Sequence, residues 1–197
     1  MTLPMRWISS MWRWAFPSSA LLALLVALPA TVRGGEIVSL DAALERIAPE
    51  AVVHEKDTLV LSKEKAAAVR RQAGPLSSRL VSRYRLYDRQ GKLLATAYID
   101  THLVRSLAET LLIAVDPAGR VRSVEVLAFK EPPEYRPRPG WYAQFNGREL
   151  GDELRIRKGI RVLAGATLSS HAATDAVRRC LAVHRLFPPP SRIDTAP

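Results

Sequence analysis

The chain has one cysteine, Cys180, among its 197 residues. A single thiol excludes an internal disulfide, and no cysteine stands near the end of the N-terminal apolar segment to accept a lipid. Cys180 lies on the apolar face of the last predicted helix, where a thiol is usually buried and inert. We therefore expect a structural thiol and not a nucleophile.

Histidines are also few, and they show no metal-ligand spacing with Cys180 or with one another. They are His54, His102, His171 and His184. No Ser-His-Asp arrangement and no pair of carboxylates stands in a context that indicates a hydrolase. The sequence thus predicts no metal site and no catalytic residue.

Acidic residues are absent from residues 1–34, which carry Arg6 and Arg13 ahead of an apolar run from Ala20 to Ala30. This run of eleven residues is too short to span a bilayer comfortably. A basic start followed by a short apolar run is typical of a secretory signal peptide. The globular part is therefore predicted to be periplasmic or otherwise extracytoplasmic. The alternative is an uncleaved N-terminal membrane anchor, because tryptophans lengthen the apolar segment.

Basic residues outnumber acidic ones, 29 against 19, which gives a formal net charge of +10. This excess persists beyond the leader and favours an anionic cofactor, an acidic partner or contact with a membrane surface. No basic motif with interleaved aromatic residues is present, so we predict no nucleic-acid partner.

Beyond the leader, helical and strand patterns alternate, which predicts an α+β fold with a small, mainly antiparallel sheet packed against helices. A short helix is expected around Leu44, ended by Pro49, and a second helix from Ser62 to Gly74. The predicted strands are Ala51–Leu61, Leu80–Tyr87, Lys92–Ile99, Thr110–Val115 and Arg120–Phe129. In the last strand, Val124, Val126 and Ala128 are expected on one side.

The last helix is predicted to begin within the segment Ala164-Gly165-Ala166-Thr167-Leu168-Ser169-Ser170. After it, apolar residues recur at the intervals of one helical face, namely Leu168, Ala172, Ala176, Cys180, Val183 and Phe187. Thr167 thus falls at the N-cap or in the first turn, where free backbone N–H groups and the helix dipole suit a phosphate group. Its hydroxyl could carry the phosphate covalently. An ordinary N-cap is the alternative.

The Gly-Ala-Thr-Leu-Ser core and the strands ahead of it resemble a known family. The upstream matches are Glu109–Asp116, Gly119–Val121, Val124–Leu127, Trp141 and Gln144–Gly147. The family is the FMN-binding domain of the flavin-carrying subunits of sodium-pumping quinone reductases and Rnf-type complexes, and of stand-alone exported FMN-binding proteins. The resemblance covers about residues 105–187. It implies FMN as the cofactor, joined through its phosphate to the last threonine of the motif by a separate flavin transferase. That threonine is Thr167.

The resemblance implies a cofactor site at the motif. A proline-rich crossing between Glu131 and Gly140 is stiff and extended, and it could deliver aromatic side chains to the flavin. The predicted FMN-binding residues are Thr167, Gly165, Ala166, Leu168, Ser169, Trp141 and Phe145. Aromatic rings can stack on the flat flavin ring, although the same rings could instead close the core. Lys158, Arg157 and Arg161 are candidates for positive charge beside the reduced flavin.

Two residues depart from the family motif, because Arg161 replaces an aspartate and Ala164 a serine or threonine. Binding of FMN without a covalent bond therefore stays open, and Ser169 and Ser170 offer other hydroxyls in the same turn.

The sequence predicts an exported electron carrier that serves a membrane oxidoreductase or another redox partner. The alternative is a non-redox binding or assembly module on the same fold that has lost flavinylation. The predicted organisation is a leader at 1–34, the N-terminal part of the domain at 35–104, an FMN-binding core at 105–187 and a flexible tail at 188–197.

Overall fold

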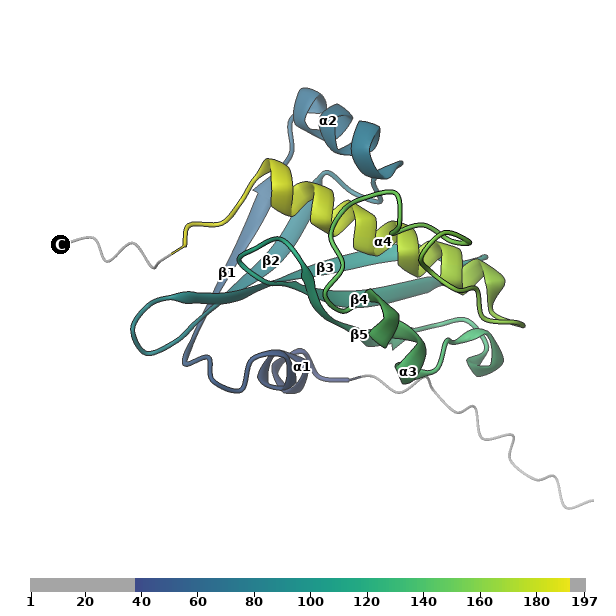
Figure 1. Cartoon of the computed structure of the whole chain (residues 1–197), viewed down its shortest axis with the longest axis horizontal. Helices are drawn as coiled ribbons and strands as arrows, with labels where there is room; N and C mark the ends of the chain where they lie inside the picture. Colours follow the sequence, from purple (N-terminus) through teal and green to yellow (C-terminus); the bar gives the residue numbers. More distant parts are fainter. Residues whose placement is uncertain (1–37, 192–197) are drawn as a thin grey trace, which may run out of the picture. The chain divides into compact units, whose positions relative to one another are not determined.

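The structure is a computed structural model, and it describes residues 38–191. The predicted leader and the last six residues of the predicted tail lie outside this range. Five strands form one antiparallel sheet in the order β1-β2-β3-β4-β5 (Figure 1), which confirms the predicted α+β fold. The strands are β1 (Val53–Val60), β2 (Leu80–Tyr87), β3 (Leu93–Leu103), β4 (Ala108–Val115) and β5 (Val121–Phe129).

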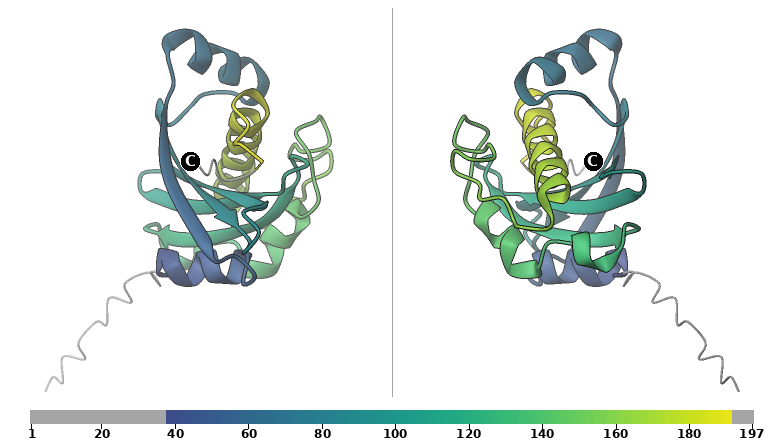
Figure 2. Two further views of the ribbon diagram at one scale, coloured as in Figure 1. Left: turned by 90° about the vertical axis from the view of Figure 1, so that its left-hand side faces the viewer. Right: turned by 90° about the vertical axis from the view of Figure 1, so that its right-hand side faces the viewer.

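Helices cover both faces of this sheet. Helix α1 (Leu40–Ile47) lies on one face and α4 (Thr167–Leu186) crosses the other, while α2 (Lys63–Ala73) packs on α4 on the side away from the sheet (Figure 2). The short helix α3 (Pro139–Tyr142) lies beside β5 between two 3-10 helices, η1 (Pro133–Tyr135) and η2 (Ala143–Phe145). Within residues 38–191, no helix combines the length and the apolar character needed to cross a membrane.

The predicted helix and turn signals act as expected. The Ser62 hydroxyl caps α2 by accepting a hydrogen bond from the Lys65 N–H at 3.2 Å. Gly74, with φ of +86°, ends the same helix. In the β4–β5 turn, the Gly119 N–H donates to the Asp116 carbonyl at 2.9 Å. Local side-chain chemistry therefore sets the limits of these elements.

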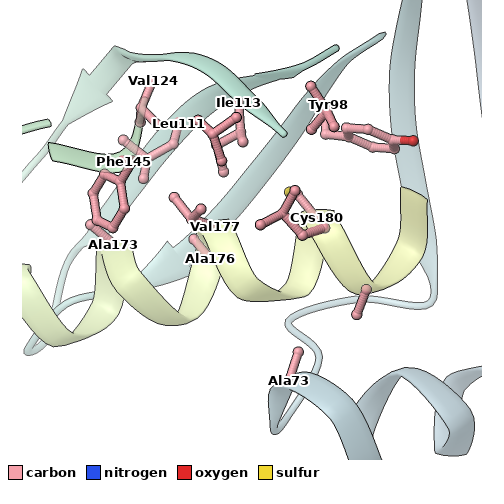
Figure 3. Close-up of a cluster of buried hydrophobic side chains, with 14 of the residues drawn as sticks. Ala73, Tyr98, Leu111, Ile113, Val124, Phe145, Ala173, Ala176, Val177 and Cys180 are labelled. Carbon is pink, nitrogen blue, oxygen red and sulfur yellow. The ribbon is translucent and has the colours of Figure 1, made fainter. Parts of the chain in front are cut away.

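Two apolar clusters pack on opposite faces of the sheet. The larger one lies between the sheet and α4 and includes Tyr98, Leu111, Phe145 and Val177 (Figure 3). The smaller one lies under α1 and is centred on Leu44. Strands β3, β4 and β5 thus contribute side chains to both cores.

The strand β5 departs from the predicted alternation. Val124 and Val126 enter the cluster under α4, but Phe129 joins them there in place of Ala128. Leu111 pairs with Val126 and Thr110 with Ala128, so Leu127 is an extra residue on this strand. This β-bulge shifts the later side chains by one position.

Helix α4 also differs from its predicted pattern. Leu168, predicted on the buried face, is 51% exposed, because it lies in the first turn at the open end of the helix. From Ala176 to His184 every side chain is buried, since the sheet lies on one side and α2 on the other. Cys180 is 3% exposed, as predicted, and burial raises the pKa of its thiol.

Candidate anion-binding site at the start of α4

The first turn of α4 presents three unpaired backbone donors. The helix begins at Thr167, and Ala166 stands at the N-cap without a side-chain hydrogen bond. In the described part of the chain, the N–H groups of Thr167, Leu168 and Ser169 have no hydrogen-bond partner. The Thr167 hydroxyl is thus not the cap of this helix. The donors and the helix dipole remain available to an anion.

Gly165 shapes the approach to this turn. Its φ is +82°, and the Ala166 N–H closes a turn on the Leu163 carbonyl at 3.0 Å. A Cβ added at Gly165 would meet no atom within 4 Å. The backbone conformation, and not lack of space, therefore calls for glycine here.

The three hydroxyls of the motif have different surroundings. The Ser169 hydroxyl is buried and donates to the Tyr135 carbonyl at 2.6 Å. The Ser170 hydroxyl is buried too; it donates to the Ala166 carbonyl at 2.9 Å and accepts from the Leu163 N–H at 3.2 Å. Thr167 is exposed. Among the three, only the Thr167 hydroxyl is accessible and uncommitted.

A hollow of about 160 Å³ opens beside this turn. Its lining consists of residues 165–169 together with Arg105 and Tyr135. Arg105 comes from the β3–β4 turn, and its guanidinium carbon lies 5.2 Å from the centre of the Tyr135 ring. Among residues 38–191, no carboxylate lines the hollow. One guanidinium and three N–H groups form a donor set that fits a phosphate.

The Glu131 side chain fixes the turn that carries Arg105. One carboxylate oxygen accepts the N–H groups of Arg105, Ser106 and Leu107 at 3.1, 2.8 and 2.8 Å. These bonds lower the pKa of Glu131, that from Leu107 most, and the positive charge of Arg105 adds a smaller lowering effect. The negative charge of Glu131 is thus held by the backbone of the turn.

The structure does not bring Trp141 and Phe145 to the hollow. Phe145 is fully buried in the core, and the Trp141 ring packs edge-to-face on it with the ring centres 5.4 Å apart. The Trp141 indole N–H donates to the Arg161 carbonyl at 2.8 Å, and the Gln144 amide oxygen accepts the Arg161 N–H at 2.8 Å. These side chains hold the segment that leads into the motif. The aromatic residue at the hollow is Tyr135.

The basic residues proposed from sequence proximity also lie elsewhere. Lys158 Nζ is 3.5 Å from Asp152, and none of Arg157, Lys158 and Arg161 lines the hollow. The positive charge there belongs to Arg105, which sequence reasoning missed because it precedes the motif by more than sixty residues. The only local signal was a basic residue in a hairpin turn.

A buried polar network lies between the sheet and α4. The Tyr142 hydroxyl donates to Glu109 at 2.9 Å, and His102 Nε2 lies 3.1 Å from the other Glu109 oxygen. His102 Nδ1 lies 2.8 Å from Asp100, which also accepts two hydrogen bonds from Arg179, at 2.8 and 3.0 Å. The chain of hydrogen bonds therefore joins α3, β4, β3 and α4.

Burial and hydrogen bonding oppose each other in this network. Burial disfavours the charged form of His102, but hydrogen bonds to Asp100 and Glu109 raise its pKa above the ordinary value. Burial likewise favours neutral Asp100, yet hydrogen bonds from His102 and Arg179 lower its pKa to about 2. Both acidic neighbours thus favour the protonated form of His102.

Comparison with known families places this geometry in context. Residues 108–182 match the model of the FMN-binding domain family. The matched segment contains β4, β5 and the first turn of α4, and it begins after Arg105. The chain matches no curated protein.

Proposed function

Because residues 108–182 form an FMN-binding domain, whose cofactor is FMN, we propose that this protein is an exported electron carrier with FMN attached to Thr167. The observation that supports this attachment most directly is the accessible Thr167 hydroxyl, which lies beside three unpaired backbone donors. The transferase would take the flavin from a flavin dinucleotide: the Thr167 oxygen loses its proton and bonds the FMN phosphorus, while the pyrophosphate bond breaks and the nucleoside monophosphate leaves. The product is a phosphodiester, with a gain in mass of FMN minus water.

The residues of the hollow support binding of the phosphate end of FMN. The N–H groups of residues 167–169 would donate hydrogen bonds to the phosphate oxygens. The positively charged Arg105 guanidinium would pair with the negative charge of the phosphate. Bound flavin supplies one- or two-electron chemistry, while the protein sets its position and surroundings. The first turn of α4 therefore serves as the anchor and not as a catalytic group.

The size of the hollow favours an exposed flavin. Its volume of about 160 Å³ is below the roughly 300–1,000 Å³ of sites that enclose a small ligand. Most of the cofactor would then remain accessible to a partner protein. An accessible flavin suits exchange of electrons with a membrane oxidoreductase, and a covalent bond would prevent its loss outside the cytoplasm.

The two departures from the family motif lie at the surface. Arg161 and Ala164 are exposed, and the Arg161 backbone is fixed by Gln144 and Trp141. Their side chains would thus face a flavin transferase without altering the turn at Gly165.

Intact mass of the purified protein tests the attachment. With a co-expressed flavin transferase, the native chain should gain the mass of FMN minus water, and Thr167→Ala should gain nothing. Ser169→Ala is the matched control, since it removes a hydroxyl from the same turn. It should keep the full mass gain while losing about 1 kcal/mol of stability with its hydrogen bond. A gain that persists in Thr167→Ala and disappears in Ser169→Ala would contradict the assignment.

The departures at Arg161 and Ala164 support one other candidate function, a non-redox binding or assembly module that no longer receives flavin. Native protein from cells that contain the transferase would then show neither a gain in mass nor flavin fluorescence. Restoring the motif with Arg161→Asp and Ala164→Ser would produce the gain only if these two positions had prevented it.

Export is part of the same proposal, and it depends on the leader at residues 1–34. Cell fractionation should find the native chain outside the cytoplasm, and removal of the leader should retain it inside. The N-terminal residue of the exported protein distinguishes a cleaved signal from an anchor.

A further inference from the structure

We propose that Arg105 is a ligand of the flavin phosphate and makes this site select FMN over riboflavin. The inference rests on the proposed function and extends it to a residue outside the matched segment. Riboflavin carries the same ring system without the phosphate. A residue that recognises the phosphate would therefore discriminate between the two flavins.

The Arg105 side chain is held beside the hollow without a close ion pair. It is exposed and forms no ion pair within residues 38–191, while the Tyr135 ring lies 5.2 Å from its guanidinium carbon. Both residues line the hollow with the first turn of α4. The cation–π contact holds the charge at the hollow without using its N–H donors.

Two arginines of α4 itself differ from Arg105. Arg179 makes two hydrogen bonds to Asp100, and Arg178 donates to the carbonyls of Gly151, Leu154 and Gln72. Their donors are used within the fold, and neither side chain lines the hollow. In the described part of the chain, Arg105 is the one cationic side chain that lines it.

Glu131 attracts Arg105 electrostatically, which helps to lower the pKa of Glu131, but the two side chains form no ion pair. One of its oxygens is occupied by the three N–H groups of the turn, and the side chain does not line the hollow. An anion in the hollow would meet a guanidinium and unpaired N–H groups, with no carboxylate among the lining residues. A phosphate is attracted under these conditions, while a neutral ribityl hydroxyl gains far less.

Equilibrium binding to the full chain, produced without flavin transferase, tests this role. Quenching of flavin fluorescence gives the Kd for FMN and for riboflavin separately. Arg105→Gln should raise the Kd for FMN about tenfold or more and leave that for riboflavin unchanged. Arg89→Gln is the control, because it removes the same charge from an exposed position in the β2–β3 turn and should change neither constant. Arg105→Lys keeps the charge without the planar guanidinium. Its Kd for FMN should lie between those of the native protein and Arg105→Gln.

The Kd values for the two flavins decide whether Arg105 recognises the phosphate. Equal losses of affinity for FMN and riboflavin in Arg105→Gln would overturn the inference. They would indicate that Arg105 contacts the flavin ring or that the substitution alters folding. Native protein that does not prefer FMN would overturn it as well. Either failure is compatible with a mass gain at Thr167, so the two proposals fail separately. A specific loss of FMN binding, together with unchanged thermal unfolding, supports the assignment.

Discussion

Thr167, Ser169 and Ser170 lie in one helical turn, yet only one of their hydroxyls faces solvent. Helical geometry turns neighbouring residues to different sides, so Ser169 and Ser170 point into the protein and find carbonyl partners. The choice among three similar hydroxyls thus follows from the direction of the helix and its packing. It does not require any difference in their chemistry.

Gly165 allows a specific prediction at this scale. Gly165→Ala should destabilise the protein by about 1–2 kcal/mol, because an L-residue is strained at a φ of +82°. No steric clash adds to this cost, since the space around the position is empty. Urea unfolding followed by circular dichroism measures the loss.

Gly140→Ala is the matched control for this change. A Cβ at Gly140 would also meet no atom within 4 Å, but its φ is not positive. Stability should stay within about 0.5 kcal/mol of the native value. Equal losses in both variants would contradict the backbone explanation.

Single residues also show the limit of sequence reasoning. Thr167 could be located from its motif, because helix starts and small-residue turns are local patterns. Arg105 and Tyr135 could not, since they reach the hollow only after a hairpin and a proline-rich segment have folded beside α4. Trp141 and Phe145 were assigned to the cofactor from their type and position. The structure places them against the core and the Arg161 carbonyl.

At the scale of elements, α3 and η2 hold the approach to the motif. Trp141 and Gln144 both bond the Arg161 backbone, so the segment before Gly165 is fastened to a short helical layer beside β5. The proline-rich crossing thus serves as a support for the motif. Its hydrogen bonds lie at the backbone and do not depend on the Arg161 side chain.

Trp141→Phe tests this support. The ring contact with Phe145 is largely retained, while the indole N–H bond to Arg161 is lost. We expect a loss of about 1 kcal/mol and faster amide exchange at residues 161–166. Exchange measured by mass spectrometry locates the change. Uniform exchange across the whole chain, with no local increase, would argue against a local clamp.

Element positions were predicted well where the signals were local. Strand β2 has the predicted bounds, and Ser62 and Gly74 limit α2 as expected. The predicted faces of β5 are wrong after Leu127, where the strand bulges. A bulge depends on the pairing with β4, so the sequence of β5 alone does not reveal it. The error at Leu168 arose because periodicity cannot show where a neighbouring layer ends.

For the molecule as a whole, the buried network is a polar connection between the sheet and α4. Asp100 and His102 come from β3, Glu109 from β4 and Arg179 from α4. Paired buried charges contribute little net stability, but removal of one partner leaves the other uncompensated. Substitutions in this network should therefore lower the free energy of unfolding, by an amount that depends on pH.

His102→Gln gives the clearest pH test. Since the folded-state pKa of His102 is raised, its contribution is fully present below the unfolded pKa of about 6.5 and is lost as pH rises through the folded value. The difference in free energy of unfolding between native and variant should thus be largest at acidic pH and shrink in alkaline solution. Urea titrations across this range measure it.

The effect of His102 must be measured as a difference between the native protein and the variant, because His184 also affects the pH dependence of stability. Burial and the nearby Arg83 charge lower its pKa, so its effect has the opposite sign and stability falls as pH drops below about 6.5. The native profile alone mixes both histidines. His171→Gln, at an exposed position, is the control and should give no comparable pH-dependent difference. A constant difference for His102→Gln would refute the proposed charge state.

The burial of α4 between the sheet and α2 has a mechanical consequence for a tethered cofactor. A helix packed on both sides from Ala176 to His184 has little freedom to tilt or slide, so its first turn is a fixed pivot. A flavin joined at Thr167 would swing on the rotatable bonds of its own ribityl arm. The reach of the redox ring toward a partner would then be a property of the ligand, while the protein supplies only the hinge point.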